Sequence, residues 1–391
     1  MALLKDLTVD GKGYYGIGAS AVDRRDDLYT YLRITDIRDD GTLDMDDLKS
    51  VANPDADKYL LKPNDIVFAR TGASTGRNYF YDGSDGTFVY AGFLIKFSID
   101  PSKVNPLYVK YYCQSVQYRN WVSSFSTGST RGNINAQTLG SMEIPLPARA
   151  QQDFLVSVLA PLDAKIKQNK KINDNLQQQV ATIFHQWFVA NPESEKWPLV
   201  TLDSLTSLVS RGIAPKYTDD SVQIVLNQKC IRDHYIDVSL ARRHNPKVIN
   251  EKWLQYGDLL INSTGEGTLG RAAQVWFVPD NMTVDSHVTI VRPKGPHLLF
   301  YIGLWGISHE REIEALHTGS TGQTELPRER VKAMELRLPD NDTLARFNAV
   351  IAPIVSLIIT NQQENVRLAS IRDALLPKLM SGEVDVSGIQ L

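Results

Sequence analysis

The 391-residue chain has few of the features that usually identify an activity or a cellular environment. It has only two cysteines, Cys113 and Cys230, and neither lies in a CxxC or Cys/His cluster, which disfavours a zinc site or a disulfide framework. No apolar run reaches the ~20 residues of a membrane helix, and the first residues lack the apolar stretch of a signal peptide. We therefore expect a cytoplasmic protein with no metal or other cofactor.

Catalytic motifs are also missing. The seven histidines show no HExxH or similar metal-ligand spacing, and the glycine-rich segment 72–77 is not a P-loop because no Gly-Lys-Ser/Thr follows it. Asn105-Pro106-Leu107-Tyr108 lacks the second proline of the methyltransferase tetrapeptide, and Gly16-Ile17-Gly18 alone is too weak to indicate a dinucleotide site. We expect a protein that is not an enzyme.

The charge balance gives no hint of a nucleic-acid partner. The formal net charge is −3, whereas phosphate binding normally shows as a basic excess. If the chain binds DNA, its positive charge must be concentrated on one face or supplied by a partner. The length alone favours two or more domains.

The sequence instead repeats itself at a separation of about 192 residues. LKPNDIVFARTGASTGR (61–77) is echoed by LQYGDLLINSTGEGTLGR (254–271), and STGSTRGNIN (126–135) by HTGSTGQTEL (317–326). MEIPLP (142–147) is answered by MELRLP (334–339), and a long segment with helical periodicity follows each. The pattern indicates a tandem duplication of one domain plus one helix.

Each copy begins with about 145 residues of mixed, β-rich character. Short apolar runs at 65–69 and 93–97 are bounded by Gly, Asn and Asp, which is typical of strands. A helix is expected at 105–121, with its equivalent at roughly 296–316. The strand order cannot be read from the pattern.

The two helical segments, 149–188 and 341–380, carry apolar stripes with heptad-like spacing. The first stripe contains Leu162, Ile166, Leu176, Val180, Ile183 and Trp187, and the second contains Ile351, Ile354, Ile358 and Leu368. Asn169 and Asn173 fill the gaps in the first, and Asn361 and Asn365 fill the gaps in the second at an offset of 192 residues. A miscounted face would explain one such asparagine; two at a common register favour a polar layer that specifies pairing.

These helices are expected to pack antiparallel, with Asn169 near Asn365 and Asn173 near Asn361. Pro161 and Pro353 share the same offset, so each helix is expected to start or kink there. About 28 residues beyond the proline give a rod of ~40 Å, and one turn of duplex DNA is ~34 Å. Such a rod could hold two DNA readers a helical turn or more apart.

At this point the chain resembles a known family. IPLPARAQQDFLVSVLAPLDAKIKQNKKINDNLQQQVATIFHQWFV (144–189) resembles the first conserved helical region of type I restriction–modification specificity subunits, and SIRDALLPKLMSGEVDV (370–386) is similar to the end of the second. The resemblance, with the duplication, covers essentially the whole chain. It departs in the recognition domains, which vary between members, so no target sequence transfers.

The resemblance implies an α+β fold of two mixed α/β target-recognition domains in tandem, with two long helices pairing as an antiparallel coiled coil and a pseudo-two-fold axis. The expected divisions are recognition domain 1 at 1–148, helix 149–190, recognition domain 2 at 191–340, helix 341–380 and a tail at 381–391. It further implies a non-catalytic subunit whose domains each read half of a bipartite double-stranded DNA site. The helices would set the gap and bind two methyltransferase subunits, and motor–nuclease subunits would join through the complex.

Base edges are read mainly by Arg, Lys, Asn and Gln, while Ser, Thr and backbone N–H groups hold phosphates. In the first copy the candidate DNA-binding residues are Arg24, Arg25, Arg33, Arg70, Thr71, Arg77, Thr130, Arg131 and Asn133. In the second they are Asn227, Gln228, Lys229, Arg242, Arg243, Asn262, Ser263, Thr264, Arg271, Thr321 and Gln323. Any one of these arginines could be a solvated surface charge, and the Thr-Gly and Gly-Ser-Thr loops could be turns that only need glycine.

Two other interpretations remain open. The chain could be a nuclease or methyltransferase itself, which the missing motifs disfavour. It could also be a coiled-coil scaffold whose β-rich domains bind protein, which the near-neutral charge favours and the family-like helices disfavour.

Overall fold

The computed structural model describes residues 1–45, 47–125, 133–245, 247–265, 267–319 and 324–383. The chain folds as two compact units: unit 1 comprises residues 1–167 and the chain from residue 365 onward, and unit 2 comprises residues 168–364. Each of the two long helices therefore contributes residues to both units.

Unit 1 is built on an antiparallel sheet with the strand order β2-β9-β6-β7 and a second sheet with the order β3-β5-β4-β8, in which β4 and β8 are parallel. A two-stranded ladder joins β1 to β10. The strands are β1 (Ala2–Leu3), β2 (Tyr14–Tyr15), β3 (Ala21–Val22), β4 (Tyr29–Leu32), β5 (Lys49–Val51), β6 (Asp65–Ala69), β7 (Asn78–Tyr81), β8 (Phe88–Tyr90), β9 (Leu94–Ser98) and β10 (Glu143–Ile144). The helices are α1 (Pro106–Tyr112), α2 (Val116–Ser123), α3 (Ala136–Gly140) and the single-turn segments η1 (Leu4–Leu7), η2 (Ala56–Tyr59) and η3 (Gly72–Ser74).

Unit 2 has a central sheet of order β12-β20-β17-β18, a second sheet β16-β13-β19 with β13 and β19 parallel, and a ladder of β11 with β21. Its strands are β11 (Leu199–Thr201), β12 (Thr206–Arg211), β13 (Ile224–Leu226), β14 (Ile231–Arg232), β15 (Tyr235–Ile236), β16 (Arg242–Arg243), β17 (Leu259–Asn262), β18 (Ala272–Gln274), β19 (Met282–Val284), β20 (Val288–Pro293) and β21 (Glu335–Arg337). Its helical segments are η5 (Pro192–Lys196), α5 (Leu202–Leu205), η6 (Gln228–Cys230), η7 (Val238–Leu240), η8 (Asn250–Lys252), η9 (Pro296–Leu298), α6 (Leu299–Ser308), α7 (Glu310–Ala315) and α8 (Arg328–Lys332).

The two central sheets have the same topology. The strand expected at 65–69 is β6, fully buried between its neighbours β9 and β7, and β17 lies between β20 and β18 in the same antiparallel arrangement. The parallel pairs β4–β8 and β13–β19 also correspond, as do the ladders β1–β10 and β11–β21. The repeated sequence thus folds into a repeated architecture, although β14 and β15 have no counterpart among the described residues of unit 1.

The duplicated aspartates at the start of β6 and just before β17 have a structural role in common. Asp65 and Asp258 are both buried, and each accepts a hydrogen bond from the backbone N–H three residues earlier. Each also faces a cation on the neighbouring strand: Lys96 lies 3.3 Å from Asp65, and Arg292 binds both oxygens of Asp258 at 2.8 Å. Burial raises the pKa of the Asp258 carboxyl, and the arginine opposes that shift.

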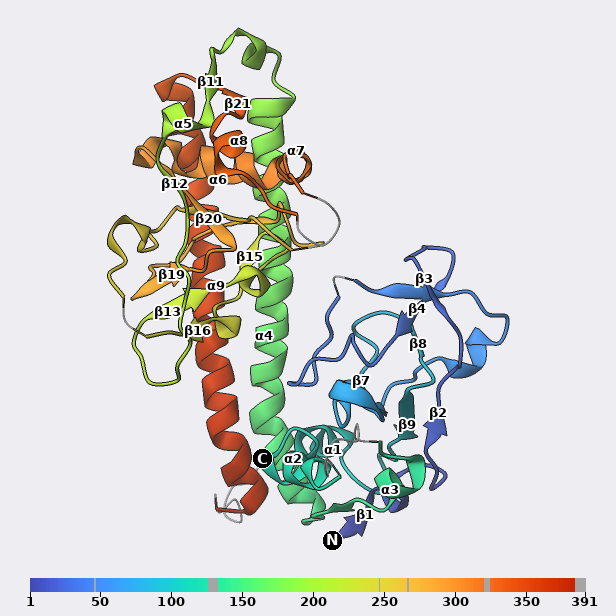
Figure 1. Ribbon diagram of the computed structural model, residues 1–391. Helices are drawn as coiled ribbons and strands as arrows, with labels where there is room; N and C mark the ends of the chain where they lie inside the picture. Colours follow the sequence, from blue (N-terminus) through green and yellow to red (C-terminus); the bar gives the residue numbers. More distant parts are fainter. Residues whose placement is uncertain (46, 126–132, 246, 266, 320–323, 384–391) are drawn as a thin grey trace. The chain divides into compact units, whose positions relative to one another are not determined.

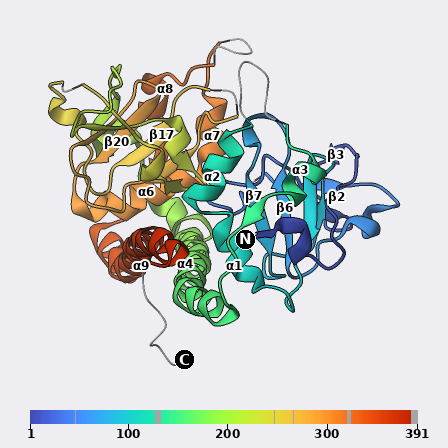
Figure 2. The same cartoon turned by 90° about the horizontal axis from the view of Figure 1, so that it is seen from below.

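The long helices are α4 (Arg149–Phe184), which continues into a π-helical turn η4 (His185–Val189), and α9 (Asn341–Ser381) (Figure 1). Every residue of the two expected apolar stripes, including the four asparagines, is buried or partly buried, which confirms the heptad-like spacing. The two helices lie side by side in both views (Figure 2).

The antiparallel pairing of the helices is evident within each unit. In unit 2, Asn361 donates to the Oδ1 of Asn173 at 2.8 Å, and Asn173 donates to the backbone carbonyl of Ile358 at 3.2 Å. In unit 1, Arg372 of α9 donates to Asp163 of α4 at 3.1 Å. The predicted pair of Asn173 and Asn361 is confirmed. Asn169 donates to Glu364 at 2.7 Å, and its predicted proximity to Asn365 stays a prediction.

Helix α9 contains an 18-residue window with a mean hydropathy of 1.7, so by length and composition alone it could cross a membrane. Core helices of soluble proteins pass the same test. Phe347, Ile351, Val355 and Ile358 of α9 are fully buried in the hydrophobic core of unit 2, which accounts for the apolar composition. We therefore interpret α9 as a core helix.

Two expectations about the helices are wrong, and one of two alternatives at the prolines is excluded. The helix expected at 105–121 is two helices, because the Ser115 side chain accepts from the backbone N–H of Tyr118 and starts α2 anew. The equivalent at 296–316 is likewise divided into η9, α6 and α7. Neither long helix begins at its proline, because both run through Pro161 and Pro353; the expected kink there stays a prediction. Asp340 caps the start of α9 by accepting from Thr343 at 2.8 Å.

Candidate nucleic-acid interface

In unit 1, several loops meet where β6 ends. The backbone N–H of Arg70 donates to Phe93 at 3.0 Å, and the carbonyl of Arg70 accepts from Ile134 at 2.9 Å. Beside them, the N–H of Gly16 donates to Leu94 at 3.1 Å. Segments 15–17, 70–77, 91–94 and 133–134 are therefore tied together by backbone hydrogen bonds. We call this the loop end of unit 1.

Unit 2 has the same arrangement where β17 ends. The N–H of Ser263 donates to His287 at 2.8 Å, and the carbonyl of Ser263 accepts from Leu326 at 2.8 Å. The N–H of Gly212 donates to Val288 at 3.0 Å. These bonds match those of unit 1 one for one. The loop end of unit 2 is therefore formed by segments 211–213, 263–265, 267–271, 285–288 and 325–326.

Repeated glycines shape the hairpin at each loop end. Gly76 and Gly270 both have a φ of 86°, a left-handed conformation that favours glycine. A Cβ would lie 2.4 Å from the side chain of Val122 at Gly76, and 2.8 Å from Glu314 Cβ at Gly270. Gly76 and Gly270, which precede Arg77 and Arg271, are thus required by the backbone conformation and by the space around them.

The side chains at matching positions of the two loop ends differ. Matching hydrogen bonds, turns and bridges pair the following residues: Tyr15 with Arg211, Arg70 with Ser263, Thr71 with Thr264, Phe93 with His287, and Asn133 with Glu325. Only the threonine is common to both. The two loop ends therefore share the same backbone hydrogen bonds but carry different side chains.

In unit 1, the loop end presents an arginine held against aromatic rings. The guanidinium carbon of Arg70 lies 5.2 Å from the ring centre of Tyr15 and 5.7 Å from that of Phe93, within cation–π range. The rings themselves are 44% and 56% exposed. The Tyr15 hydroxyl accepts from the backbone N–H of Ala136 at 3.2 Å, which fixes the ring.

In unit 2, the loop end presents a polar cluster. Gln228 donates to the hydroxyl of Thr264 at 2.5 Å, and that hydroxyl lies 2.8 Å from the Nδ1 of exposed His287. Arg211 pairs with Glu325 at 2.6 Å and donates to the carbonyl of Leu326. Amide, hydroxyl and imidazole groups can both donate hydrogen bonds to base edges and accept them from base edges. The guanidinium of Arg70 can only donate, so the two loop ends differ in chemistry.

Three further candidate arginines of unit 1 that the structure describes have partners in the chain. Arg25 pairs with Asp27 at 2.6 Å, Arg77 with Asp39 at 2.6 Å, and Arg24 donates to the carbonyl of Arg25 at 2.8 Å. None of the three belongs to the aromatic group around Arg70.

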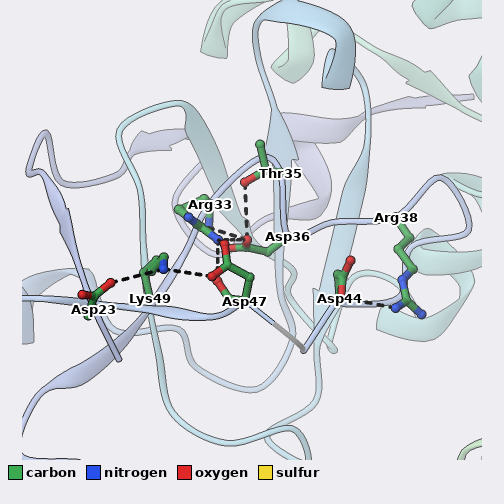
Figure 3. Close-up of polar contacts among 8 residues, drawn as sticks. All are labelled: Asp23, Arg33, Thr35, Asp36, Arg38, Asp44, Asp47 and Lys49. Carbon is green, nitrogen blue, oxygen red and sulfur yellow. Dashed lines mark hydrogen bonds and ion pairs between the residues drawn. The ribbon is translucent and has the colours of Figure 1, made fainter. Parts of the chain in front are cut away.

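Arg33 belongs to an acidic cluster that Figure 3 shows in detail. Its Nη2 lies 2.6 Å from buried Asp36 and 3.6 Å from Asp47, while Lys49 bridges Asp47 and Asp23. The excess of carboxylates around Arg33 makes this surface unfavourable for a phosphate backbone.

The remaining candidates of unit 2 are divided between buried supports and exposed groups. Asn262 and Ser263 are fully buried, and Asn262 donates to the carbonyl of Gln228 at 3.2 Å, so it positions that residue. Arg271 is partly buried and lies before β18. The exposed or half-exposed candidates are Asn227, Lys229, Arg242 and Arg243. The side chain of Asn227 accepts from the backbone N–H of Lys229. The guanidinium carbon of Arg242 lies 3.6 Å from the ring centre of Tyr217, and Arg243 donates to the carbonyl of Ser221.

Four predicted residues, Thr130, Arg131, Thr321 and Gln323, lie outside the described residues. Conversely, Tyr15, Phe93, Arg211 and His287 belong to the loop ends and were not predicted. A signal for two of them exists in the sequence, because the dipeptide Gly-Ile follows both Tyr15 and Arg211. Among the described residues, no group of three His, Cys, Asp or Glu side chains could hold a metal ion.

Comparison with known proteins shows which proteins this chain resembles. Residues 22–178 match the model of the type I restriction modification DNA specificity domain. The chain is 26% identical over 311 residues to the type I restriction enzyme MjaIX specificity subunit of Methanocaldococcus jannaschii, covering 71% of this chain and 69% of that protein. It is 20% identical over 414 residues to the HindI specificity subunit of Haemophilus influenzae, covering 85% and 89%. The chain is therefore similar to type I restriction enzyme specificity subunits over most of its length.

The fold of the chain agrees with that of a solved specificity subunit. The crystal structure of the type I restriction–modification S subunit from M. genitalium has a TM-score of 0.57 and 14% sequence identity, and the match covers 97% of this chain and 95% of that one. The expected α+β class with long helices is thereby confirmed. At this identity the likeness concerns the fold alone.

Proposed function

We propose that this specificity subunit recognises a bipartite double-stranded DNA site, with each loop end reading one half. The observation that carries the proposal is the duplicated loop end, in which matching backbone hydrogen bonds hold different side chains. A split site with two unlike halves needs this combination, because positioning must be common to both halves while the base contacts differ. The similarity to type I restriction enzyme specificity subunits supports the same function.

The rest of the chain has supporting roles in this proposal. Residues 1–148 and 191–340 are the recognition domains, and α4 and α9 set the gap between half-sites and dock two methyltransferase subunits, through which motor–nuclease subunits join. The subunit itself is non-catalytic and acts in the cytoplasm, where its DNA is.

The decisive experiment maps methylated bases in the genome of the host and of a strain from which this gene is deleted. We expect a split motif with a fixed gap that loses its methylation on deletion and regains it when the gene is restored. Restoration of methyltransferase genes without this gene is the control. A methylation pattern that the deletion leaves unchanged would contradict the proposal. It would favour the alternative of a coiled-coil scaffold whose β-rich domains bind protein.

A further inference from the structure

Among the described residues, Arg70 differs from Arg25, Arg33 and Arg77 in having no acceptor. Arg25, Arg33 and Arg77 each pair with an aspartate, whereas no carboxylate or carbonyl among the described residues accepts from the guanidinium of Arg70. Its Nε is buried and without a hydrogen-bond partner in that part of the chain. A buried, unsatisfied donor on a charged group is costly, so it indicates an acceptor that arrives from outside.

The surroundings hold the guanidinium rather than neutralise it. The rings of Tyr15 and Phe93 attract the cation through their faces and restrict its orientation, yet they provide no acceptor. Phe93 is more than half exposed, and the backbone of Phe93 is bonded to that of Arg70 at 3.0 Å. The arginine is thus ordered before any ligand binds, which lowers the entropic cost of binding.

The geometry of this group suits a guanine edge better than a single phosphate oxygen. A guanidinium offers a planar fork of donors, and the O6 and N7 atoms of guanine accept two of them in one plane in the major groove. Fixing the orientation of the fork adds little to attraction toward a phosphate, whereas bidentate contact with a base depends on it.

We propose that Arg70, braced by Tyr15 and Phe93, reads a guanine in the half-site of unit 1. The proposal rests on the function proposed above and deepens it. Unit 2 has Ser263 in place of Arg70, and its Arg211 is engaged by Glu325, so this reader is specific to one half of the site. The two halves of the DNA site are therefore read with different chemistry.

The test measures binding of the complete complex with its methyltransferase subunits to duplexes in which each base pair of the methylated motif is changed in turn. With Arg70→Lys, which keeps the charge and loses the fork, we expect discrimination at one G·C pair of one half-site to fall by about 5- to 150-fold. Phe93→Leu should weaken discrimination at the same pair, because the brace is lost while Arg70 remains.

Two controls separate this role from general effects. Lys58→Ala removes an exposed positive charge of unit 1 that pairs with Asp55, and it should leave discrimination at every position unchanged. Gln228→Ala, at the loop end of unit 2, should leave the G·C pair read by Arg70 unaffected. A change at that same pair would overturn the assignment to unit 1.

Other outcomes would overturn the inference without touching the proposed function. If Arg70→Ala weakens binding to all duplexes by the same factor and reduces its salt dependence, while Arg70→Lys keeps both close to the wild type, Arg70 contacts a phosphate. If both variants discriminate as the wild type does, Arg70 does not read DNA. A wild-type complex without any split motif would instead contradict the proposed function itself.

Discussion

At the scale of single residues, Asp163 connects three elements of unit 1. It lies on α4 and accepts from Lys110 at 2.8 Å and Tyr111 at 2.9 Å, both on α1, while Arg372 of α9 donates to it at 3.1 Å. Burial works to raise the pKa of this carboxyl, but Lys110 and Arg372 outweigh it and hold the pKa below the ordinary 3.8. One carboxylate thus fastens the recognition domain of unit 1 to its helices.

Replacing Asp163 with Asn should destabilise the chain by about 3 kcal/mol at neutral pH, because two partly buried cations lose their counter-charge. The lowered pKa means that the folded state favours the charged form. The contribution of Asp163 is therefore complete above pH 3.8 and is lost as the pH falls through the lower folded-state value. Urea unfolding followed at several pH values should show the wild type and the variant converging in acid.

The matched control is Asp373→Asn. Asp373 pairs with the same Arg372 at 2.8 Å but is 64% exposed, so its loss should cost no more than about 1 kcal/mol. Equal effects of the two substitutions, or a difference that persists in strong acid, would show that Asp163 does not act through its charge.

At the scale of elements, the polar layer between α4 and α9 is built from matched asparagines. Asn173 and Asn361 are each 7% exposed, and their mutual hydrogen bond lies among apolar residues such as Ile358 and Leu176. A Leu at either position would fit the apolar stripe and bury more hydrocarbon. The asparagines therefore contribute to the choice of partner and register more than to stability.

A double-mutant cycle tests this interpretation. Asn173→Leu alone should destabilise unit 2 by about 1–3 kcal/mol, because Asn361 is left buried without its partner. Adding Asn361→Leu should recover most of that loss, since both polar groups are then gone. Thermal melting gives the stabilities, and disulfide crosslinking between engineered cysteines on the two helices reports whether the register has become mixed. Additive losses in the double variant would contradict the pairing.

The helices could be predicted from the sequence because their evidence is local. The spacing of Leu162, Asn169 and Asn173 along one helix fixes its buried face, and the repeated asparagines identify the partner. The break at Ser115 was missed because the apolar pattern continues from Tyr111 through Trp121, and a single serine cap decides where the helix restarts.

The loop ends could be predicted only in part. Arg70 and Thr264 belong to repeated motifs, but Phe93 and His287 reach them through hydrogen bonds across the sheet from strands more than twenty residues away. Strand order decides which loops meet, and the alternation of apolar residues gives no information about it. The burial of individual residues could not be predicted either. Asparagine is a residue type that reads bases, but Asn262 is fully buried inside unit 2.

At the scale of the whole molecule, the charge raises a question about binding to a polyanion. The net charge is −3, and many cations near the candidate interface are engaged by the chain itself, as Arg77 is by Asp39 and Arg211 by Glu325. Discrimination between bases needs few charges, whereas affinity for duplex DNA comes largely from neutralised phosphates. We therefore expect the partner subunits to supply most of the phosphate contacts.

This division of labour predicts different salt dependences for the chain alone and for its complex with the methyltransferase subunits. The slope of log K against log salt is about −0.9 for each phosphate contact, so the complex should show a slope several units steeper than the isolated chain. Both slopes can be measured by fluorescence anisotropy with one duplex that contains the motif, at salt concentrations from about 50 to about 300 mM. A duplex with a scrambled motif is the control: it should retain most of the slope of the complex, because phosphate contacts do not depend on sequence. Equal slopes for the chain and the complex would mean that this acidic chain makes the phosphate contacts itself. Cations such as Arg77 and Arg211 would then have to leave their ion pairs with Asp39 and Glu325 when DNA binds.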